Sequence, residues 1–139
     1  MIDLCFPNYE FRIKNKHNKK YIFDEIRKKF ILLTPEEWVR QNCVKYLINE
    51  QRISRELINV EKKIKINNLT KRYDIVVFKN NGDVFLLVEC KSPNIRINQE
   101  TFNQISIYNS QINADFLMIT NGLFNYYCII DYSNQCFKF

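Results

Sequence analysis

Two carboxylates and a lysine in the middle of the chain have the types and spacing of a phosphodiester-cleaving site. Fourteen residues separate Asp74 from Glu89, and Lys91 comes two residues after Glu89. Mg²⁺ takes oxygen ligands, commonly one or two carboxylates completed by waters and substrate phosphates. A metal there can polarise a phosphodiester and activate water, while a nearby lysine orients that water or stabilises developing negative charge. Phosphodiester hydrolysis is the reaction that these residues suit.

A β-hairpin would bring these three residues together. Asn81-Gly82 is the strongest short signal for a two-residue hairpin loop, and the segments 73–78 and 84–90 on either side are rich in apolar residues. A loop centred on Asn81-Gly82 places Phe78 opposite Phe85 and Asp74 opposite Glu89, with Cβ atoms about 5 Å apart. Lys91 falls on the face of Glu89, because side chains alternate along a strand.

The metal-site hypothesis depends on the register of that hairpin. Two facing carboxylates on apolar strands repel each other and resist desolvation, so the pair costs stability unless a cation is shared. Alternatively, both acids lie at a sheet edge and form ordinary surface salt bridges with Arg72 or Lys91. A shift of one residue at the turn would move Asp74 and Glu89 to opposite faces.

The surrounding pattern predicts an α/β fold with a mixed sheet. Thr34-Pro35-Glu36-Glu37 is typical of a helix start, with Thr34 as the N-cap and Glu37 closing a capping box, and the helix extends to about Asn49. Alternating apolar residues predict a strand over 58–66. The other expected elements are a short N-terminal hairpin of 9–14 and 20–26, a helix over 98–112, and strands over 115–120 and 125–131.

The predicted order of the core is therefore α-β-β-β-α-β-β. With 139 residues, 46% hydrophobic and 26% charged, the chain has the size and composition of one globular domain. We expect residues 1–139 to form that domain, with 1–33 as an N-terminal extension and 34–139 as the core. No apolar run could span a bilayer and the N-terminus lacks a signal-peptide pattern, so we expect a soluble, cytoplasmic protein without a membrane partner.

Composition argues against several other chemistries. The five cysteines form no CxxC pair and His17 is the only histidine, which argues against a zinc site and against histidine-based catalysis. We expect most cysteines to be small buried hydrophobes. The two glycines, Gly82 and Gly122, cannot form a Walker-type phosphate loop, so these residues hold no ATP-driven motor.

The net charge of +6 favours a polyanionic partner such as nucleic acid. Lys and Arg cluster at residues 14–20, 27–29, 62–65 and 71–72. Alternatively, these are solvated lysines that keep the domain soluble.

The arrangement of Asp74, then Glu89-Cys90-Lys91, on consecutive strands between helices resembles the PD-(D/E)XK nuclease superfamily. More closely, residues 72–77, 87–93 and Thr120-Asn121-Gly122 resemble the N-terminal nuclease domain of type I restriction enzyme R subunits and its small stand-alone bacterial relatives, over residues 33–139. Tyr73 stands where the superfamily name has proline. The resemblance implies a restriction-endonuclease-like core, a central mixed β-sheet flanked by helices.

The resemblance also implies roles for the central residues. Asp74 and Glu89 would bind Mg²⁺, for which Mn²⁺ can substitute, and Lys91 would assist the attack of water. Many members add an acidic metal ligand from the first helix, for which Glu37 or Glu36 is the candidate here. The capping box is the competing explanation for Glu37.

A second motif follows on the next helix. Some branches of the superfamily carry Gln-x-x-x-Tyr there, and Gln104 and Tyr108 match it. Residues four apart share a helix face, so both could turn toward the metal site or a phosphate. The alternative is an ordinary polar and aromatic helix face.

Three functions remain open from the sequence. The first is a Mg²⁺-dependent nuclease acting on DNA, and the second is a catalytically silent nucleic-acid-binding or assembly module that keeps the fold. The third is an RNA-directed nuclease. A homodimer or partner restriction subunits are the expected protein partners.

Overall fold

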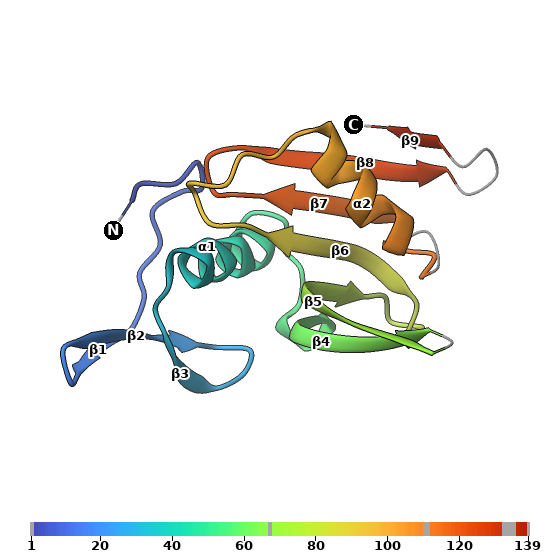
Figure 1. The fold of residues 1–139 in the computed structure, drawn as a ribbon. Helices are drawn as coiled ribbons and strands as arrows, with labels where there is room; N and C mark the ends of the chain where they lie inside the picture. The colour runs from blue at the N-terminus through green and yellow to red at the C-terminus, as the bar shows by residue number, and fades with distance from the viewer. Residues whose placement is uncertain (1, 67, 110–111, 132–135, 139) are drawn as a thin grey trace.

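The computed structural model describes residues 2–66, 68–109, 112–131 and 136–138, and it begins with a small antiparallel sheet. Its strands are β1 (Ile13–Lys16), β2 (Lys19–Asp24) and β3 (Lys29–Leu32), which lie apart from the larger sheet (Figure 1). The expected N-terminal hairpin was wrong in its bounds and lacked β3. His17 and Asn18 form the loop, with φ values of 52° and 63°, a left-handed pair that the sequence does not signal with glycine.

The rest of the chain forms a six-stranded mixed sheet in the order β4-β5-β6-β7-β8-β9, in which only β6 and β7 pair in parallel. Its elements are α1 (Pro35–Asn49), a 3₁₀ turn (Arg55–Leu57), β4 (Ile58–Ile66), β5 (Leu69–Phe78), β6 (Val84–Cys90), α2 (Gln99–Asn109), β7 (Phe116–Thr120), β8 (Asn125–Asp131) and β9 (Cys136–Lys138). The predicted α/β class and the order of the core are confirmed; β9 was not predicted.

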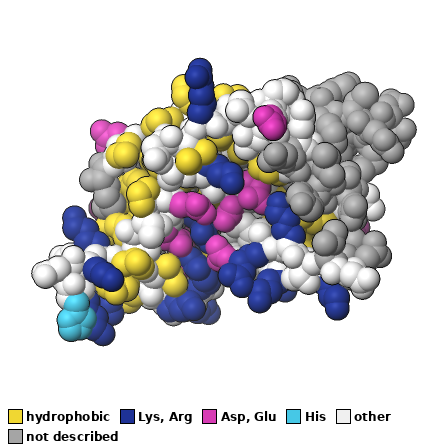
Figure 2. All heavy atoms as spheres, in the orientation of Figure 1, with side chains coloured by type: hydrophobic (Ala, Val, Ile, Leu, Met, Phe, Trp, Pro, Cys, Tyr) yellow, Lys and Arg dark blue, Asp and Glu magenta, His cyan; other side chains and the backbone are white. Residues whose placement is uncertain are grey.

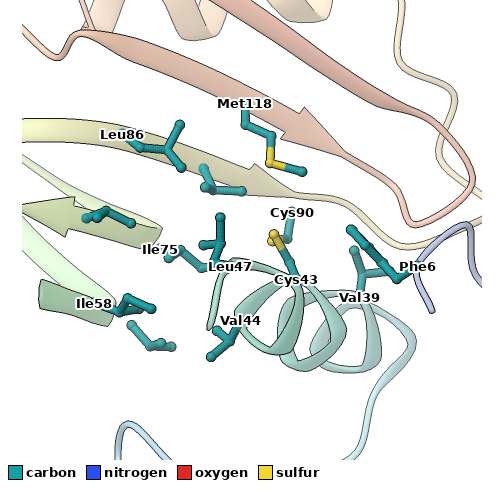
Figure 3. Close-up of a cluster of buried hydrophobic side chains, with 13 residues drawn as sticks. Phe6, Val39, Cys43, Val44, Leu47, Ile58, Ile75, Leu86, Cys90 and Met118 are labelled. Atoms are coloured by element: carbon teal, nitrogen blue, oxygen red, sulfur yellow. The ribbon is translucent and has the colours of Figure 1, made fainter. Parts of the chain in front are cut away.

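The two helices cover opposite faces of this sheet. On β6, Leu86 and Val88 pack with α1, in the cluster that Figure 3 shows around Cys43 and Cys90, whereas Leu87 packs with Phe102 of α2. A sheet covered on both faces needs strands with apolar residues at consecutive positions. That requirement explains why β5 and β6 lack simple alternation.

The β5–β6 hairpin differs from the expected two-residue loop. Gly82 N donates to Lys79 O (3.0 Å) and Lys79 N donates to Asp83 O (2.7 Å), so the loop holds three residues, 80–82. Gly82 has a φ of 93°, which favours glycine at this position of a three-residue loop. Phe78 pairs with Val84, not with Phe85 as predicted.

A β-bulge then restores the predicted register. Because Phe78 pairs with Val84 while Val77 pairs with Leu86, Phe85 is the extra residue on β6. From there Val76 lies opposite Leu87 and Ile75 opposite Val88. These two pairs have the register that follows from the predicted loop, and Asp74 and Glu89 are the next residues along the two strands.

Two further expectations concern composition. Cys43, Cys90 and Cys128 are buried, as expected, whereas Cys5 is exposed. No helix in the described part of the chain is long and apolar enough to cross a membrane.

Candidate active site

Three acidic residues lie in one row across β4, β5 and β6. On β4, Val60 and Lys62 pair with Ile75 and Tyr73, so Glu61 and Asp74 lie between these pairs, and Arg40 forms ion pairs with both carboxylates. Glu89 is the next residue of β6 after the Ile75–Val88 pair. Glu61 has a φ of 57°, a left-handed conformation that is uncommon for a non-glycine residue inside a strand and that clusters at functional sites.

Asp74 is held by a backbone donor and a guanidinium. Its Oδ2 accepts a hydrogen bond from Cys90 N at 2.8 Å, and its Oδ1 lies 3.6 Å from Arg40 Nη2. Burial nevertheless raises the pKa of Asp74, against the opposing effects of the Cys90 amide and Arg40. The carboxylate is therefore fixed in orientation.

Glu89 has fewer hydrogen-bonding partners than Asp74. Its side chain is buried, and Oε1 accepts no hydrogen bond; Lys71 Nζ lies 3.5 Å from that oxygen. Burial first, and then the charge of Asp74, raise the pKa of Glu89 to about 7. The pKa of Asp74 is raised as well, mainly by burial.

This geometry fits a divalent cation bound by two carboxylates. The raised pKa values of both acids show that their negative charges are poorly neutralised, and the buried Glu89 Oε1 has no hydrogen-bond partner among the described residues. No group of three or more His, Cys, Asp or Glu residues that could hold a metal occurs among the described residues. Mg²⁺ does not need such a cage, because waters and substrate phosphates commonly complete its octahedron.

Lys91 is positioned by the turn after β7. Its backbone N donates to Thr120 O at 2.8 Å, and its positive charge opposes the raised pKa values of both Glu89 and Glu36. The charge of Lys91 therefore lowers the pKa of both carboxylates, against the effect of burial.

The Thr120-Asn121-Gly122 segment is a hydrogen-bonded turn. Asn121 Oδ1 accepts from the backbone N of Leu123 and of Phe124, both at 2.9 Å, and its Nδ2 donates to Ile95 O at 2.9 Å. These bonds tie the turn to the loop that begins at Lys91. The motif thus anchors the backbone of the loop that begins at Lys91.

Gly122 is required in this turn for two reasons. Its φ is 83°, and a Cβ built there would lie 2.6 Å from Leu4 Cδ2 and 3.0 Å from Val39 Cγ2. Any side chain would therefore be strained and would also collide with the packing of the N-terminal segment on α1.

The structure places Glu37 in an ion-pair network instead of beside the carboxylate pair. Its backbone N donates to Thr34 Oγ1 at 3.0 Å, as the predicted N-cap requires. The reciprocal half of the capping box is not formed, because Glu37 Oε2 accepts from Arg27 Nη2 and from Gln41 Nε2, both at 2.9 Å. These bonds engage Glu37 Oε2 in fixing α1 to the N-terminal sheet, and the role of Glu37 as a metal ligand remains a prediction.

Glu36 is the acidic residue of α1 whose pKa is raised by the charge of Asp74. Burial raises its pKa, and the charge of Asp74 raises it further. Of the two acids considered on this helix, Glu36 therefore has the better position for an additional metal or water contact.

Arg40 connects these acids and was missed by the sequence reasoning. Its guanidinium forms ion pairs with four carboxylates, those of Glu36, Glu37, Glu61 and Asp74. Its spacings of four and three from Glu36 and Glu37 are the sequence signals that could have found it.

The second motif lies partly outside the described residues. Positions 104 and 108 both fall in α2, but the side chains of Gln104 and Tyr108 are not among those that the structure describes. Phe102 and Ile105 of the same helix are buried against the sheet. The roles expected for Gln104 and Tyr108 remain predictions.

Figure 2 shows Asp and Glu side chains gathered near the middle of one face, bordered by Lys and Arg side chains. The model of the family described as type I restriction enzyme R protein N terminus (HSDR_N) matches residues 35–139. The chain belongs to this family. The match begins at the first residue of α1 and includes all six strands of the mixed sheet, so every site residue described above lies within it. Comparison with curated proteins gives no match.

Membership in this family connects the chain with DNA restriction. The three N-terminal strands lie outside the matched residues.

Proposed function

We propose that this protein is a Mg²⁺-dependent nuclease of the PD-(D/E)XK type that hydrolyses phosphodiester bonds in DNA. The observation that carries the proposal is the neighbouring pair of the partly buried Asp74 and the buried Glu89, in which Glu89 Oε1 has no hydrogen-bond partner among the described residues. Family membership supports DNA as the substrate.

Asp74 and Glu89 would hold the cation. Cys90 N donates a hydrogen bond to Asp74 Oδ2, so the orientation of the Asp74 carboxylate is set before a cation binds. Glu89 must release its proton first, and its pKa of about 7 makes cation binding favourable from neutral pH upward. The bound cation would supply polarisation of the phosphodiester and a lower pKa for a coordinated water.

Lys91 would act on the attacking water and on charge that develops at the phosphate. Its backbone is anchored to Thr120 O, and its ammonium has three donors that can orient a water or stabilise an oxyanion. Glu36 would replace Glu37 as the additional acidic contact from α1. Gln104 and Tyr108 would contribute from α2 if their side chains turn toward the site.

The test compares the wild type with Asp74→Asn and Lys91→Gln on supercoiled, linear and single-stranded DNA and on RNA, in Mg²⁺, Mn²⁺ or EDTA. We expect metal-dependent DNA cleavage that falls by at least about 100-fold in each variant. Asp83→Asn, which changes an exposed acid directly after the hairpin loop, is the matched control and should cut as the wild type does.

Each other outcome has a definite meaning. Full activity in Asp74→Asn or Lys91→Gln, with folding intact, would rule out the proposed site. Cleavage of RNA in preference to DNA would reassign the substrate, and DNA binding without cleavage by the wild type would favour the non-catalytic module. Size-exclusion chromatography with and without DNA tests the expected homodimer.

A further inference from the structure

The N-terminal sheet has one face on the protein and one face outward. Ile22 and Asp24 of β2 are fully buried on the inner face. Asp24 Oδ2 accepts from Gln41 Nε2 of α1 at 3.0 Å, and from Arg27 Nε at 2.6 Å. These buried bonds hold the sheet on α1, the helix that also carries Glu36 and Arg40.

The strands of the sheet place mainly basic and aromatic residues on the outward face. Strand alternation and the register place these strand residues on it: Lys14, Lys16, Lys19, Tyr21, Phe23, Phe30 and Leu32. Arg12 joins them, because its carbonyl accepts a hydrogen bond from Phe23 N at 2.9 Å and thereby continues the ladder. The tip of this sheet is the end marked by the single histidine in Figure 2.

The cations on this face form no recorded ion pair with the described part of the protein, although Glu10 and Glu25 line the same hollow as Arg12 and Phe23. Arg12, Lys14, Lys16 and Lys19 are all exposed, and none of them takes part in an ion pair recorded for the described residues. Lys16 lies directly opposite Lys19, and like charges in that position destabilise a strand pair. An external polyanion would offset this repulsion.

The aromatic rings hold two of these charges in place. The Arg12 guanidinium carbon lies 4.5 Å from the centroid of the Phe23 ring and 5.5 Å from that of Phe30, and Lys14 Nζ lies 4.3 Å from the Phe30 centroid. Such cation–π contacts restrict the side chains before any ligand binds. They also cover ring faces on which unpaired bases would otherwise stack.

We propose that this outward face binds the phosphate backbone of duplex DNA, without reading its sequence. The cations are held in place on the aromatic rings, and the faces of these rings are not available for stacking with bases. Such a surface suits the phosphates of a duplex better than the unpaired bases of a single strand. The choice of DNA as the polyanion rests on the proposed function, whereas the surface itself does not. Because α1 joins this sheet to the carboxylates, the duplex held here has a fixed position relative to the site.

The test measures binding of a labelled duplex by fluorescence anisotropy in EDTA, as a function of salt. The variant is Lys14→Gln/Lys16→Gln/Lys19→Gln on the outward face. The matched control, Lys20→Gln/Lys28→Gln/Lys29→Gln, removes three exposed charges from the same small sheet, at inner-face and loop positions. Thermal unfolding of both variants checks that the sheet is intact.

We expect the outward-face variant to bind at least about tenfold more weakly and to lose roughly two to three units of the slope of log K against log salt, at about 0.9 unit per phosphate contact. The control should change affinity by less than about threefold. Equal loss in both variants, or no loss in the outward-face variant, would overturn the inference. Tighter binding of single-stranded DNA or of duplex RNA would also overturn it.

The two proposals fail separately, because binding in EDTA requires no metal. If the wild type cuts DNA and the outward-face variant binds like the wild type, the inference is wrong and the nuclease stands. If the wild type never cuts but binding is lost only in the outward-face variant, the surface stands and the nuclease is wrong.

Discussion

Like charges face each other across neighbouring strands in two regions of this protein, with different consequences. Asp74 and Glu89 meet on β5 and β6 in the buried centre of the mixed sheet, whereas Lys16 and Lys19 meet at the exposed tip of the N-terminal sheet. Water screens the lysines, so their repulsion is small and sensitive to salt. The two acids instead have raised pKa values, and Arg40 and Lys71 lie beside them.

The difference shows that burial, more than charge type, determines how a like-charge pair is accommodated. The charge of a buried pair must be neutralised inside the protein. Such a pair is therefore recognised by raised pKa values and by neighbouring cations. An exposed pair does not produce these effects and is identified only from the register of its strands. The buried pair suits one small hard cation, and the exposed row suits an extended polyanion.

The largest expected effect comes from removing the internal cation of the acidic region. Arg40→Met would leave Glu61 and Asp74 without their shared guanidinium, so we expect the free energy of unfolding to fall by roughly 3–5 kcal/mol at pH 8. Urea unfolding followed by fluorescence of Trp38 measures this loss. Arg12→Met, in the exposed region, is the control and should cost no more than about 1 kcal/mol. Equal losses would contradict the contrast between the regions.

The pH dependence of stability gives the next largest effect. Glu89 has a folded pKa of about 7 against an ordinary value of 4.5, so between these values the folded chain holds a proton that the unfolded chain releases. The wild type in EDTA should therefore lose stability as pH rises from about 5 to 8. Glu89→Gln should remove this decline and be about 1–3 kcal/mol more stable than the wild type at pH 8, but not at pH 5.

Metal binding and a second variant complete this experiment. Mg²⁺ or Mn²⁺ at pH 8 should stabilise the wild type, by about 2.7 kcal/mol at 100 times the dissociation constant, and should stabilise Glu89→Gln much less. Glu100→Gln, an exposed acid on α2, should retain the wild-type pH dependence. If the stability of the wild type does not decline above pH 5, the pKa of Glu89 is not raised in the folded chain.

The smallest effect is expected from the exposed lysine pair. Lys16→Glu converts it to an opposite-charge pair and should stabilise the chain by about 0.2–1 kcal/mol at low salt. The gain should disappear in 1 M salt, where the Debye length is about 3 Å. Chemical denaturation in urea at two salt concentrations measures it. A gain that persists in high salt would mean that strand propensity, and not charge, is responsible.

The sequence predicted the core order and the facing of Asp74 and Glu89 because both depend on local periodicity and on chain length between elements. Loop type was less predictable, since Asn81-Gly82 is compatible with either a two-residue loop or a three-residue loop followed by a bulge. The helix cap at Thr34 was correct, but the partners of Glu37 were not, because Arg27 comes from another element. Arg40 was missed for the same reason: three-dimensional proximity gives it Glu61 and Asp74.

The loop and the bulge between Asp74 and Glu89 also limit how this hairpin can change length. One extra residue in the loop moves all later side chains of β6 to the other face, and one extra residue at Phe85 moves them back. Alignment of the two acids therefore depends on the parity of the chain between them. Insertions or deletions there should be tolerated in pairs, as two compensating changes, whereas a single one should turn Glu89 away from Asp74.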